Sequence, residues 1–506
     1  MQRKDIYLVG SLLGIILLIF YPLFYSDYLF MDEAVQIWNF KSVPGFHMFI
    51  NQGRWFAELL ETWLFRFVHT IQDIKYLRLL SLLGWCSCLP VWYTVIKRLI
   101  GDVQQYKYLP FFTCLYLVTS LPFIVSVQWA TCLQFFIAHT CGLLSGAVLL
   151  QNMRLVENRI RIAPVPVMIS STLSVVSLFT YQSAFGCFLI PFLLHFVSVK
   201  TVKKDKIYIT GLSFYFIGYV IYFALYKLSL FINHIPHDPR TTIHIDLWTK
   251  ITFFLARPLE RSFRFTVLTD EDSKISKVYY ALMLVALAVA AFIRFGRSQW
   301  QQAVKYLAVI GLTFFISYFP SLVVKENYAS NRTLLALNLC VFIVCLDMIL
   351  YFIKNKTVLW VAGSAAAAVF IFSARYNFRN EFLHPVQQET AALKEYIQQH
   401  YHNGITKVEF IRPSEYLIAE KYHVNKSMDE FGVASTCWIW VPEPFTRHMV
   451  YELTGDRKAA AALEIKQWPD KESYMHSGEQ ANSNTMVLDV PAIIMGNSYT
   501  SSVPVP

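Results

Sequence analysis

Two adjacent carboxylates, Asp32 and Glu33, follow the first apolar stretch of the chain, in the segment Ser26-Asp27-Tyr28-Leu29-Phe30-Met31-Asp32-Glu33-Ala34. Carboxylates beside hydrocarbon are costly unless they are hydrated, paired or used. Partial burial would raise the pKa of one of them, and a carboxylate of raised pKa is suited to accept a proton from an alcohol. A hydrated loop in which two acids happen to be neighbours is the simpler interpretation, and composition alone favours it.

Basic residues in the same loop and in later loops suggest a second kind of chemistry. Arg54 stands in Asn51-Gln52-Gly53-Arg54-Trp55, and Lys325 and Arg332 bound a later polar segment. A carboxylate pair and cations suit a reaction with a phosphate leaving group, because the cations can take up the charge that develops on phosphate. Each cation also fits a snorkelling anchor or an ion-pair partner. The interpretation as a membrane anchor or ion-pair partner also applies to four further cations, which are Arg257, Arg261, Arg264 and Lys227.

Other chemistries have less support in the sequence. No P-loop and no G-x-G-x-x-G turn opens a helix, which argues against direct use of ATP or a nucleotide sugar. Eight of the nine cysteines lie in apolar runs, and they show neither a disulfide framework nor metal-ligand spacing. A histidine-rich loop matches no tight zinc pattern, so we expect a polar structural loop without a metal. Its candidate ligands are His234, His237, Asp238, His244 and Asp246.

The composition defines the class of protein that must position these residues. The chain has 506 residues, of which 55% are apolar and only 15% are charged, and its mean hydropathy is +0.41. A soluble chain would be near a quarter charged, so we expect a mainly α polytopic membrane protein. The net charge of +10 does not indicate nucleic-acid binding, because the basic residues lie between apolar runs and form no stripe interleaved with aromatics.

About eleven apolar stretches have the length of a membrane span. The only polar break in the long stretch from Ala163 to Val199 is Tyr181-Gln182-Ser183, so we divide it there. The predicted spans are Tyr7–Phe24, Leu77–Ile96, Tyr108–Ser126, Ala130–Leu150, Ala163–Thr180, Ser183–Val199, Ile207–Ile232, Val278–Phe295, Leu307–Val324, Thr333–Phe352 and Val358–Ala374.

The distribution of positive charge predicts the orientation. Loops on one side hold many Lys and Arg, whereas the short opposite loops at Gln128 and Gln182 hold none. The positive-inside rule therefore predicts a cytoplasmic N-terminus, and an odd number of spans places the C-terminus outside. Residues 1–374 form the predicted membrane module, with external loops at 25–76, 233–277 and 325–332, and residues 375–506 form an external tail.

Two of the external segments have predicted structure of their own. From Arg54 to Thr70, apolar residues four apart predict an interfacial helix with Glu58 and Glu61 turned toward water; these residues are Trp55, Leu59, Trp63 and Phe67. The tail combines helical stretches with strand-like runs, which predicts a small α/β domain. Those stretches are Glu389–Gln399 and Pro444–Leu453, and the runs are Lys407–Ile411 and Met486–Val490.

In layout and in short motifs the chain resembles the class C glycosyltransferases, which use polyprenyl-phosphate sugars. Within them it is most similar to the serotype-converting O-antigen glucosyltransferases of bacteriophage gtr clusters. Relatives often carry an Asp-Asp pair followed by a nearby Arg, whereas here the second acid is Glu33 and no Arg follows closely. The likeness rests on Asp32-Glu33, Gly53-Arg54, Tyr181-Gln182-Ser183, Ser330-Asn331-Arg332-Thr333 and Asp429-Glu430-Phe431-Gly432.

The resemblance implies a mechanism without metal or cofactor. Asp32 would deprotonate a hydroxyl of the O-antigen acceptor, which attacks undecaprenyl-phosphate glucose in one inverting displacement. Glu33 would orient the acceptor or Asp32, and the reaction would occur on the periplasmic face of a bacterial inner membrane. The implied phosphate-binding residues are Arg332, Arg54, Lys325 and Lys227. The implied substrate-binding residues are Asp27 as a reserve base, Gln182, Arg257, Arg261 and Trp438, although Gln182 also fits a turn residue and Trp438 a core residue.

Two other functions compete with this one. A transporter or flippase of lipid-linked saccharides would use Arg54 and Arg332 to line a path, but it should carry charges at mid-span and broken helices in matched halves, and no internal repeat is evident. An O-antigen ligase or polymerase would also place Arg in external loops, yet it leaves the Asp32-Glu33 pair unexplained. The sequence predicts no oligomeric state.

Overall fold

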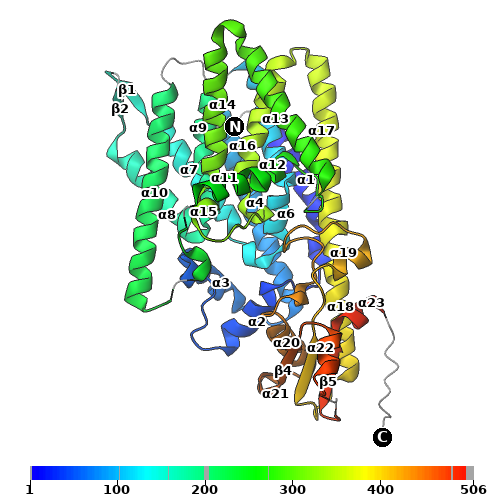
Figure 1. Cartoon of the computed structure of the whole chain (residues 1–506). Coiled ribbons are helices and arrows are strands. Elements are labelled where there is room, and N and C mark those ends of the chain that lie inside the picture. Colours follow the sequence, from blue (N-terminus) through cyan, green and yellow to red (C-terminus); the bar gives the residue numbers. More distant parts are fainter. Residues whose placement is uncertain are drawn as a thin grey trace.

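The computed structural model describes residues 3–101, 103–157, 159–198, 204–236, 238–244, 246–271, 273–479 and 482–496. It is mainly α, with long helices packed into a bundle and a small sheet beyond one end of it (Figure 1). The sequence-based expectation of a mainly α fold is confirmed. A short hairpin of β1 (Arg154–Val156) and β2 (Arg159–Arg161) lies at the opposite end of the bundle from that sheet (Figure 1).

Seven of the described helices are long and apolar enough to cross a membrane, and a bent pair raises the number to eight. Apolar side chains such as Ile275, Phe231 and Phe372 are exposed on these helices, which suits contact with lipid. The chain therefore has the helices of a multi-pass membrane protein. The seven are α1 (Arg3–Phe20, continued to Tyr25), α4 (Ile71–Ile100), α7 (Phe135–Gln151), α10 (Lys204–Asn233), α13 (Lys274–Phe295), α16 (Leu335–Phe352) and α17 (Lys356–Tyr376).

The remaining predicted spans coincide with shorter or bent helices, so the number eleven stays a prediction. The bent pair is α5 (Leu109–Thr119) and α6 (Leu121–Gln128), which meet at 48° where Ser120 is extended. Tyr181 is also extended and separates α8 (Pro164–Thr180) from a 3-10 segment that leads into α9 (Leu189–Ser198), as the polar break predicted. The predicted span at Leu307–Val324 corresponds to α14 (Trp300–Ser317) and α15 (Phe319–Val323).

The loop after α1 forms two helices, α2 (Asp32–Ser42) and α3 (Trp55–Phe65), near the sheet-bearing end of the bundle (Figure 1). Leu59, Trp63 and Phe67 are exposed, as an interfacial helix requires. The expectation that Glu58 and Glu61 face water is wrong, because both are buried. Glu58 accepts hydrogen bonds from the backbone N–H groups of Met48 and Phe49, and Glu61 accepts one from Gln36.

The chain passes from the bundle to its C-terminal part without a break in helix. The helix α17 continues through a π-helical turn (Asn377–Leu383) into α18 (His384–His400). Beyond it, β3 (Lys407–Ile411) pairs in parallel with β4 (Glu464–Trp468) and β5 (Thr485–Asp489), in the order β4-β3-β5. The predicted strand at Lys407–Ile411 is confirmed, and β4 was not predicted. Helices α19 (Leu417–Tyr422), α20 (Pro442–Thr454), α21 (Arg457–Ala462), α22 (Lys471–His476) and α23 (Val490–Met495) complete this part.

Two short helices, α11 (Leu247–Ala256) and α12 (Pro258–Phe263), precede α13. Asp246 caps α11 by accepting a hydrogen bond from the backbone of Thr249. The backbone of His244 donates to Val323, so this loop lies against the segment that follows α15. These contacts bring the loops 233–277 and 325–332 together at the same end of the bundle as α2 and α3.

Candidate active-site cavity

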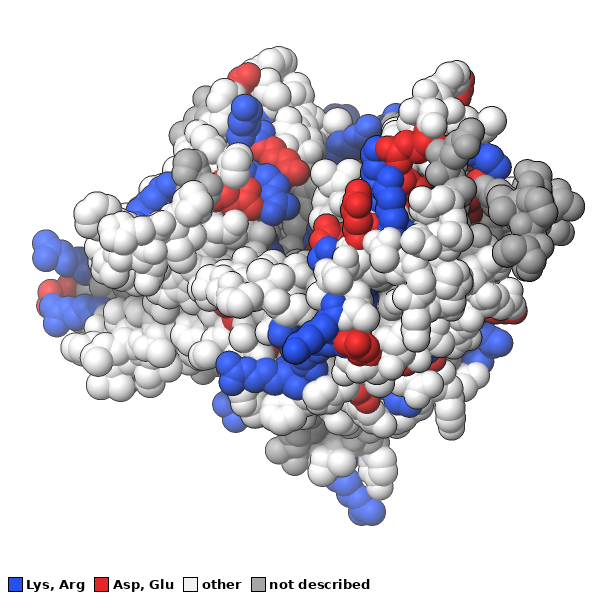
Figure 2. Space-filling view, turned by 90° about the horizontal axis from the view of Figure 1, so that it is seen from below, with Lys and Arg blue, Asp and Glu red and all other residues white. Residues whose placement is uncertain are grey.

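A cavity of about 1470 Å³ lies where the bundle, the loops and the C-terminal part meet. Figure 2 shows this end of the molecule, with acidic and basic side chains gathered around a hollow in its middle. The lining comes from segments far apart in the sequence: the start of α2, the loop 46–54, the Tyr181–Ser183 break, α10, the loops before α11 and after α15, and residues 415–440. Only the tertiary fold brings these segments together.

Asp32 lies on the cavity wall as the first residue of α2 and is half-buried. The indole Nε1–H of Trp440 donates a 3.0 Å hydrogen bond to its Oδ1, and within the described part of the chain Oδ2 has no hydrogen-bond donor. Burial raises the pKa of Asp32 above its usual value, although Arg332 and the Trp440 hydrogen bond oppose the shift. The preceding Met31 has a φ of +46°, an uncommon backbone conformation that holds the turn into α2. Asp32 can therefore accept a proton through Oδ2.

Glu33 has a different environment, although it is the next residue. It is fully buried and pairs with Arg78 of α4, and it also accepts hydrogen bonds from the backbone N–H groups of Ala130 at 2.6 Å and Phe30 at 2.8 Å. The Arg78 guanidinium also donates to the Tyr28 carbonyl at 3.0 Å. Glu33 does not line the cavity, so its position in the structure does not support the expectation that it orients the acceptor. It ties the start of α2 to the bundle.

Arg54 enters the cavity from the loop before α3, with its guanidinium over the Tyr181 ring at 4.8 Å. Its Nε donates a 3.0 Å hydrogen bond to the Gln182 side chain, whose amide group in turn donates to Gln52 and Tyr222 at 2.7 Å. Gln182 thus holds Arg54 in place with its protein contacts, as a hydrogen-bonded turn residue would. No described carboxylate lies within ion-pair distance of Arg54, so its charge is not neutralised by a direct partner.

Arg332 lines another wall of the cavity and is paired. It forms a 2.9 Å ion pair with Asp429, donates to the Tyr328 hydroxyl at 2.6 Å, and lies over the Trp129 ring at 4.6 Å. Burial opposes the charge, but Asp429 and the other acidic neighbours outweigh it and raise the pKa of Arg332. Arg332 therefore stays charged in the cavity.

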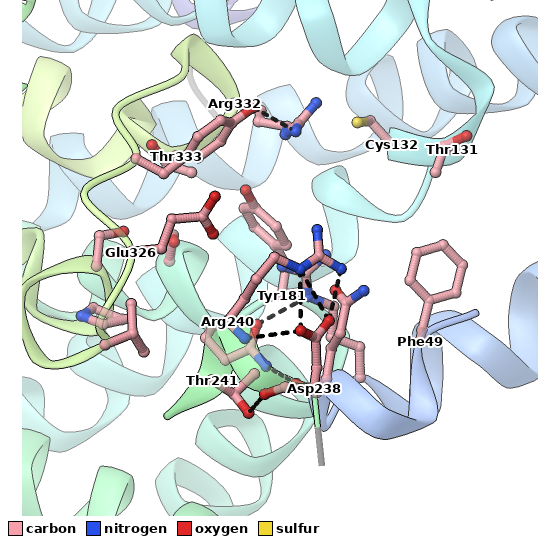
Figure 3. A pocket seen from close by; sticks show the side chains of 18 of the residues that line it. Phe49, Thr131, Cys132, Tyr181, Asp238, Arg240, Thr241, Glu326, Arg332 and Thr333 are labelled. Atoms are coloured by element: carbon pink, nitrogen blue, oxygen red, sulfur yellow. Dashed lines mark hydrogen bonds and ion pairs between the residues drawn. The ribbon is translucent and has the colours of Figure 1, made fainter. Parts of the chain in front are cut away.

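A third guanidinium, that of Arg240, was not predicted from the sequence. It forms a bidentate contact with Asp238, whose pKa this contact lowers despite partial burial. Figure 3 shows Arg332 on one wall of the cavity and Arg240 with Asp238 on the opposite one. Arg54, Arg240 and Arg332 line the same cavity. Burial lowers the pKa of Arg54, and the positive charges of Arg332 and Arg240 lower it further. Arg240 and Arg332 are each paired with a carboxylate, so among the described residues Arg54 is the member of this cluster whose charge is available to an anion.

The tandem Trp438 and Trp440 also line the cavity. Their rings stack at 5.2 Å between centroids, and Trp440 is 47% exposed. A partly exposed aromatic pair beside Asp32 offers a flat apolar surface of the kind that can pack against a sugar ring. Trp438 is partly buried and packs against the core, as the alternative for that residue predicted, whereas Trp440 is exposed.

Besides Glu33, five predicted residues do not line the cavity. Lys227 is exposed on α10 beside the Phe223 and Tyr226 rings, and Lys325 is exposed on the loop after α15. Asp27 accepts a 3.4 Å hydrogen bond from Gln72. The last two are held by protein partners: Arg257 donates to the Glu271 carbonyl, and Arg261 donates to the Ala329 carbonyl and pairs with Glu271.

The histidine-rich loop shows no metal centre in the described residues, where no three metal-ligating side chains gather. Asp238 is committed to Arg240, and Asp246 caps α11. His237 lies outside the described residues. The sequence analysis did not select Arg78 or Arg240, although the sequence contains a sign of each. Arg78 is a cation at the start of a predicted span, and Arg240 follows Asp238 by two positions in the same loop.

No family model, no curated protein and no solved structure matches this chain. The resemblance to class C glycosyltransferases therefore rests on the sequence motifs alone. The geometry by itself gives a carboxylate suited to accept a proton, a cluster of guanidinium groups suited to bind an anion, and a stacked indole pair, all on one cavity.

Proposed function

We propose that the chain is a membrane glycosyltransferase that moves a glucosyl group from undecaprenyl-phosphate glucose to a sugar hydroxyl of lipid-linked O-antigen. The single observation that carries the proposal is that Asp32 shares one cavity with Arg54, Arg240 and Arg332. This combination provides a base for the nucleophile and cations for the leaving group, which are the two needs of glycosyl transfer from a lipid phosphate. The proposed location is a bacterial inner membrane, with the N-terminus cytoplasmic and the C-terminus periplasmic.

The reaction is a single inverting displacement. The acceptor oxygen attacks the anomeric carbon while its proton moves to Oδ2 of Asp32. The bond from the anomeric carbon to the phosphate oxygen breaks, and its electron pair stays on the lipid phosphate. Arg54 is the first candidate to stabilise the increased phosphate charge, because it has no direct carboxylate partner among the described residues. Arg332 and Arg240 assist from the flanking walls.

The apolar part of the cavity supports a lipid donor. Beside α10 and α15 the lining consists of apolar and aromatic side chains, several of them exposed on the outside of the bundle. An isoprenoid chain could lie along this surface while its phosphate reaches the guanidinium groups. The side chains that support this placement are Phe216, Val220, Phe223, Phe319 and Val323.

The indole pair supports an acceptor on the other side of Asp32. A sugar packed against the exposed face of Trp440 would bring a hydroxyl near the carboxylate that the same indole contacts. Trp440 therefore supports both acceptor stacking and the orientation of Asp32. The tail that carries it, residues 375–506, is the proposed acceptor-binding part.

The test uses purified protein in lipid, radiolabelled undecaprenyl-phosphate glucose and O-antigen acceptor, and compares wild type with Asp32→Asn. Wild type should transfer label to the acceptor, and the variant should lose at least about 100-fold in rate, the usual contribution of a general base. Full activity in the variant would remove Asp32 from the mechanism. Movement of lipid across the bilayer by wild type without any transfer of sugar would instead favour the transporter.

A further inference from the structure

The cluster around Arg332 contains an anion that belongs to the protein itself. Asp429 pairs with Arg332 at 2.9 Å through Oδ2, and its Oδ1 accepts a 2.6 Å hydrogen bond from the Tyr328 hydroxyl. The Arg332 and Asp429 side chains are 20% and 17% exposed, and both line the cavity. Asp429 and the Tyr328 hydroxyl both contact Nη2 of Arg332, so a phosphate oxygen that binds this nitrogen has to displace the carboxylate.

The neighbouring Glu430 has a separate task. It is fully buried and accepts hydrogen bonds from the backbone N–H groups of Asn331 at 2.7 Å and Arg332 at 2.9 Å. Gln128 of α6 also donates to the Glu430 carbonyl. The loop that carries Arg332 is thus held at its backbone by Glu430, and the side chain is supported from beneath by Trp129. Neither contact requires Asp429.

We propose that Asp429 is an exchangeable counter-ion of Arg332. It neutralises Arg332 when no phosphate is bound, gives way when the lipid phosphate enters, and pairs with Arg332 again as the product lipid phosphate leaves. This inference rests on the proposed function, because it assumes that the anion is a polyprenyl phosphate.

The physical reason is competition for a single guanidinium. A carboxylate and a phosphate cannot both form close ion pairs with Arg332 without repelling one another. Asp429 therefore weakens binding of the phosphate and, in the same measure, helps to release it. The product carries more negative charge than the phosphodiester donor, so it would otherwise be held more tightly by the three guanidinium groups.

The experiment measures binding of undecaprenyl phosphate to the full chain in lipid nanodiscs, together with glucosyl transfer by the same preparations. Asp429→Asn keeps the shape of the side chain and removes its charge, and we expect it to bind the lipid phosphate roughly three- to tenfold more tightly than wild type does. The matched control is Glu443→Gln, because Glu443 lies in the same C-terminal part but outside the cavity, and it pairs with Arg447 rather than Arg332. This control should bind as wild type does.

A double variant tests whether the effect passes through Arg332. In an Arg332→Gln background, Asp429→Asn should no longer tighten binding, because the competition has been removed. Asp429→Ser, which also lacks the charge, serves if the asparagine variant is unstable, and it should tighten binding in the same direction.

Each outcome decides the proposal. Unchanged or weaker binding by the Asp429 variants, while wild type binds undecaprenyl phosphate and transfers glucose, overturns the exchange and leaves the proposed function intact. Equal tightening by Glu443→Gln also overturns it, because the effect would then be one of general charge. If wild type neither binds undecaprenyl phosphate nor transfers glucose, the proposed function fails, and the inference fails with it.

Discussion

At the scale of single residues, two adjacent acids in one helix have opposite surroundings. Asp32 faces the cavity with one oxygen uncommitted among the described residues, whereas Glu33 is buried against Arg78 and two backbone N–H groups. Removing one member of a buried ion pair leaves the other charge without compensation, which costs far more than losing an exposed pair. The carboxylate of Asp32 is therefore available for a reaction, whereas the carboxylate of Glu33 stabilises the fold.

The first prediction separates these two tasks. Glu33→Gln should lower the free energy of unfolding by roughly 3–5 kcal/mol, because Arg78 stays buried without its partner. Asp32→Asn should leave thermal unfolding in detergent close to that of wild type while abolishing transfer. A stable, inactive Glu33→Gln protein would contradict the structural assignment of Glu33.

A second prediction concerns pH. Asp32 must be charged to accept a proton, and burial raises its pKa, so kcat/KM should fall as the pH falls through a value above that of an ordinary aspartate. The Trp440 hydrogen bond stabilises the charged form, so Trp440→Phe should move this acid limb to higher pH. The pH profile of transfer measures both effects.

Trp438→Phe is the control for the pH prediction. This substitution removes part of the stacked pair. The native Trp438 side chain makes no hydrogen bond to Asp32 among the described residues, so none is lost. Its acid limb should therefore stay where wild type has it, even if transfer slows. If the acid limb of the pH profile moves equally in both variants, the shift comes from the packing of the indoles and not from the hydrogen bond to Asp32.

At the scale of elements, the loop before α3 is fastened to α10 by tyrosines. Tyr226 donates to the Asn51 carbonyl at 2.7 Å, and Tyr222 lies against Gly53, the residue before Arg54. Gly53 has a φ of +75°, and a Cβ there would lie 2.3 Å from the Tyr222 hydroxyl oxygen. Glycine is therefore required at this position for its conformation and for its lack of a side chain.

A third prediction uses a second glycine in the same loop as the control. Gly53→Ala should displace the Arg54 loop and lower kcat/KM roughly tenfold to a hundredfold, because small displacements of a positioning group have large effects on rate. Gly45→Ala carries the same strain of about 1–2 kcal/mol at a φ of +69° but meets no atom within 4 Å. It should lower stability without a comparable loss of transfer. Equal kinetic losses would contradict the contact with Tyr222.

At the scale of the whole molecule, the C-terminal part completes the cavity that the bundle begins. Trp440 contacts Asp32, and Asp429 contacts Arg332. The continuous helix from α17 through α18 joins this part to the bundle with few internal hinges. The site is therefore formed by both parts of the chain, on the end of the bundle away from the β1–β2 hairpin (Figure 1).

The fourth prediction tests the proposed orientation, in which the C-terminal part lies on the periplasmic side. Met475→Cys in α22 and Leu155→Cys in β1 place exposed thiols at opposite ends of the molecule. A membrane-impermeant maleimide should label position 475 from the periplasmic side, and position 155 only after the inner membrane is opened. Wild type gives the background from the native cysteines. If position 155 is labelled before position 475, the orientation is the reverse of the proposed one.

The sequence by itself determined the class of protein, the positions of the helical stretches and the strand at Lys407–Ile411. These features depend on composition and periodicity over short windows, so local patterns are enough to reveal them. It also placed Asp32, Arg54, Arg332 and Trp438 among the candidates, through the adjacent carboxylates, the cations in the external loops and the resemblance to class C glycosyltransferases.

Only the tertiary structure decided which candidates share a cavity. Glu33 finds Arg78 at a separation of 45 residues, and Arg332 finds Asp429 at a separation of 97 residues, so no local pattern could assign either pair. The same holds for Gln182, whose side chain accepts a hydrogen bond from Arg54 at a separation of 128 residues in the sequence. Burial and pairing are properties of the packed chain, and they are what separate the acid that can react from the acid that holds the fold.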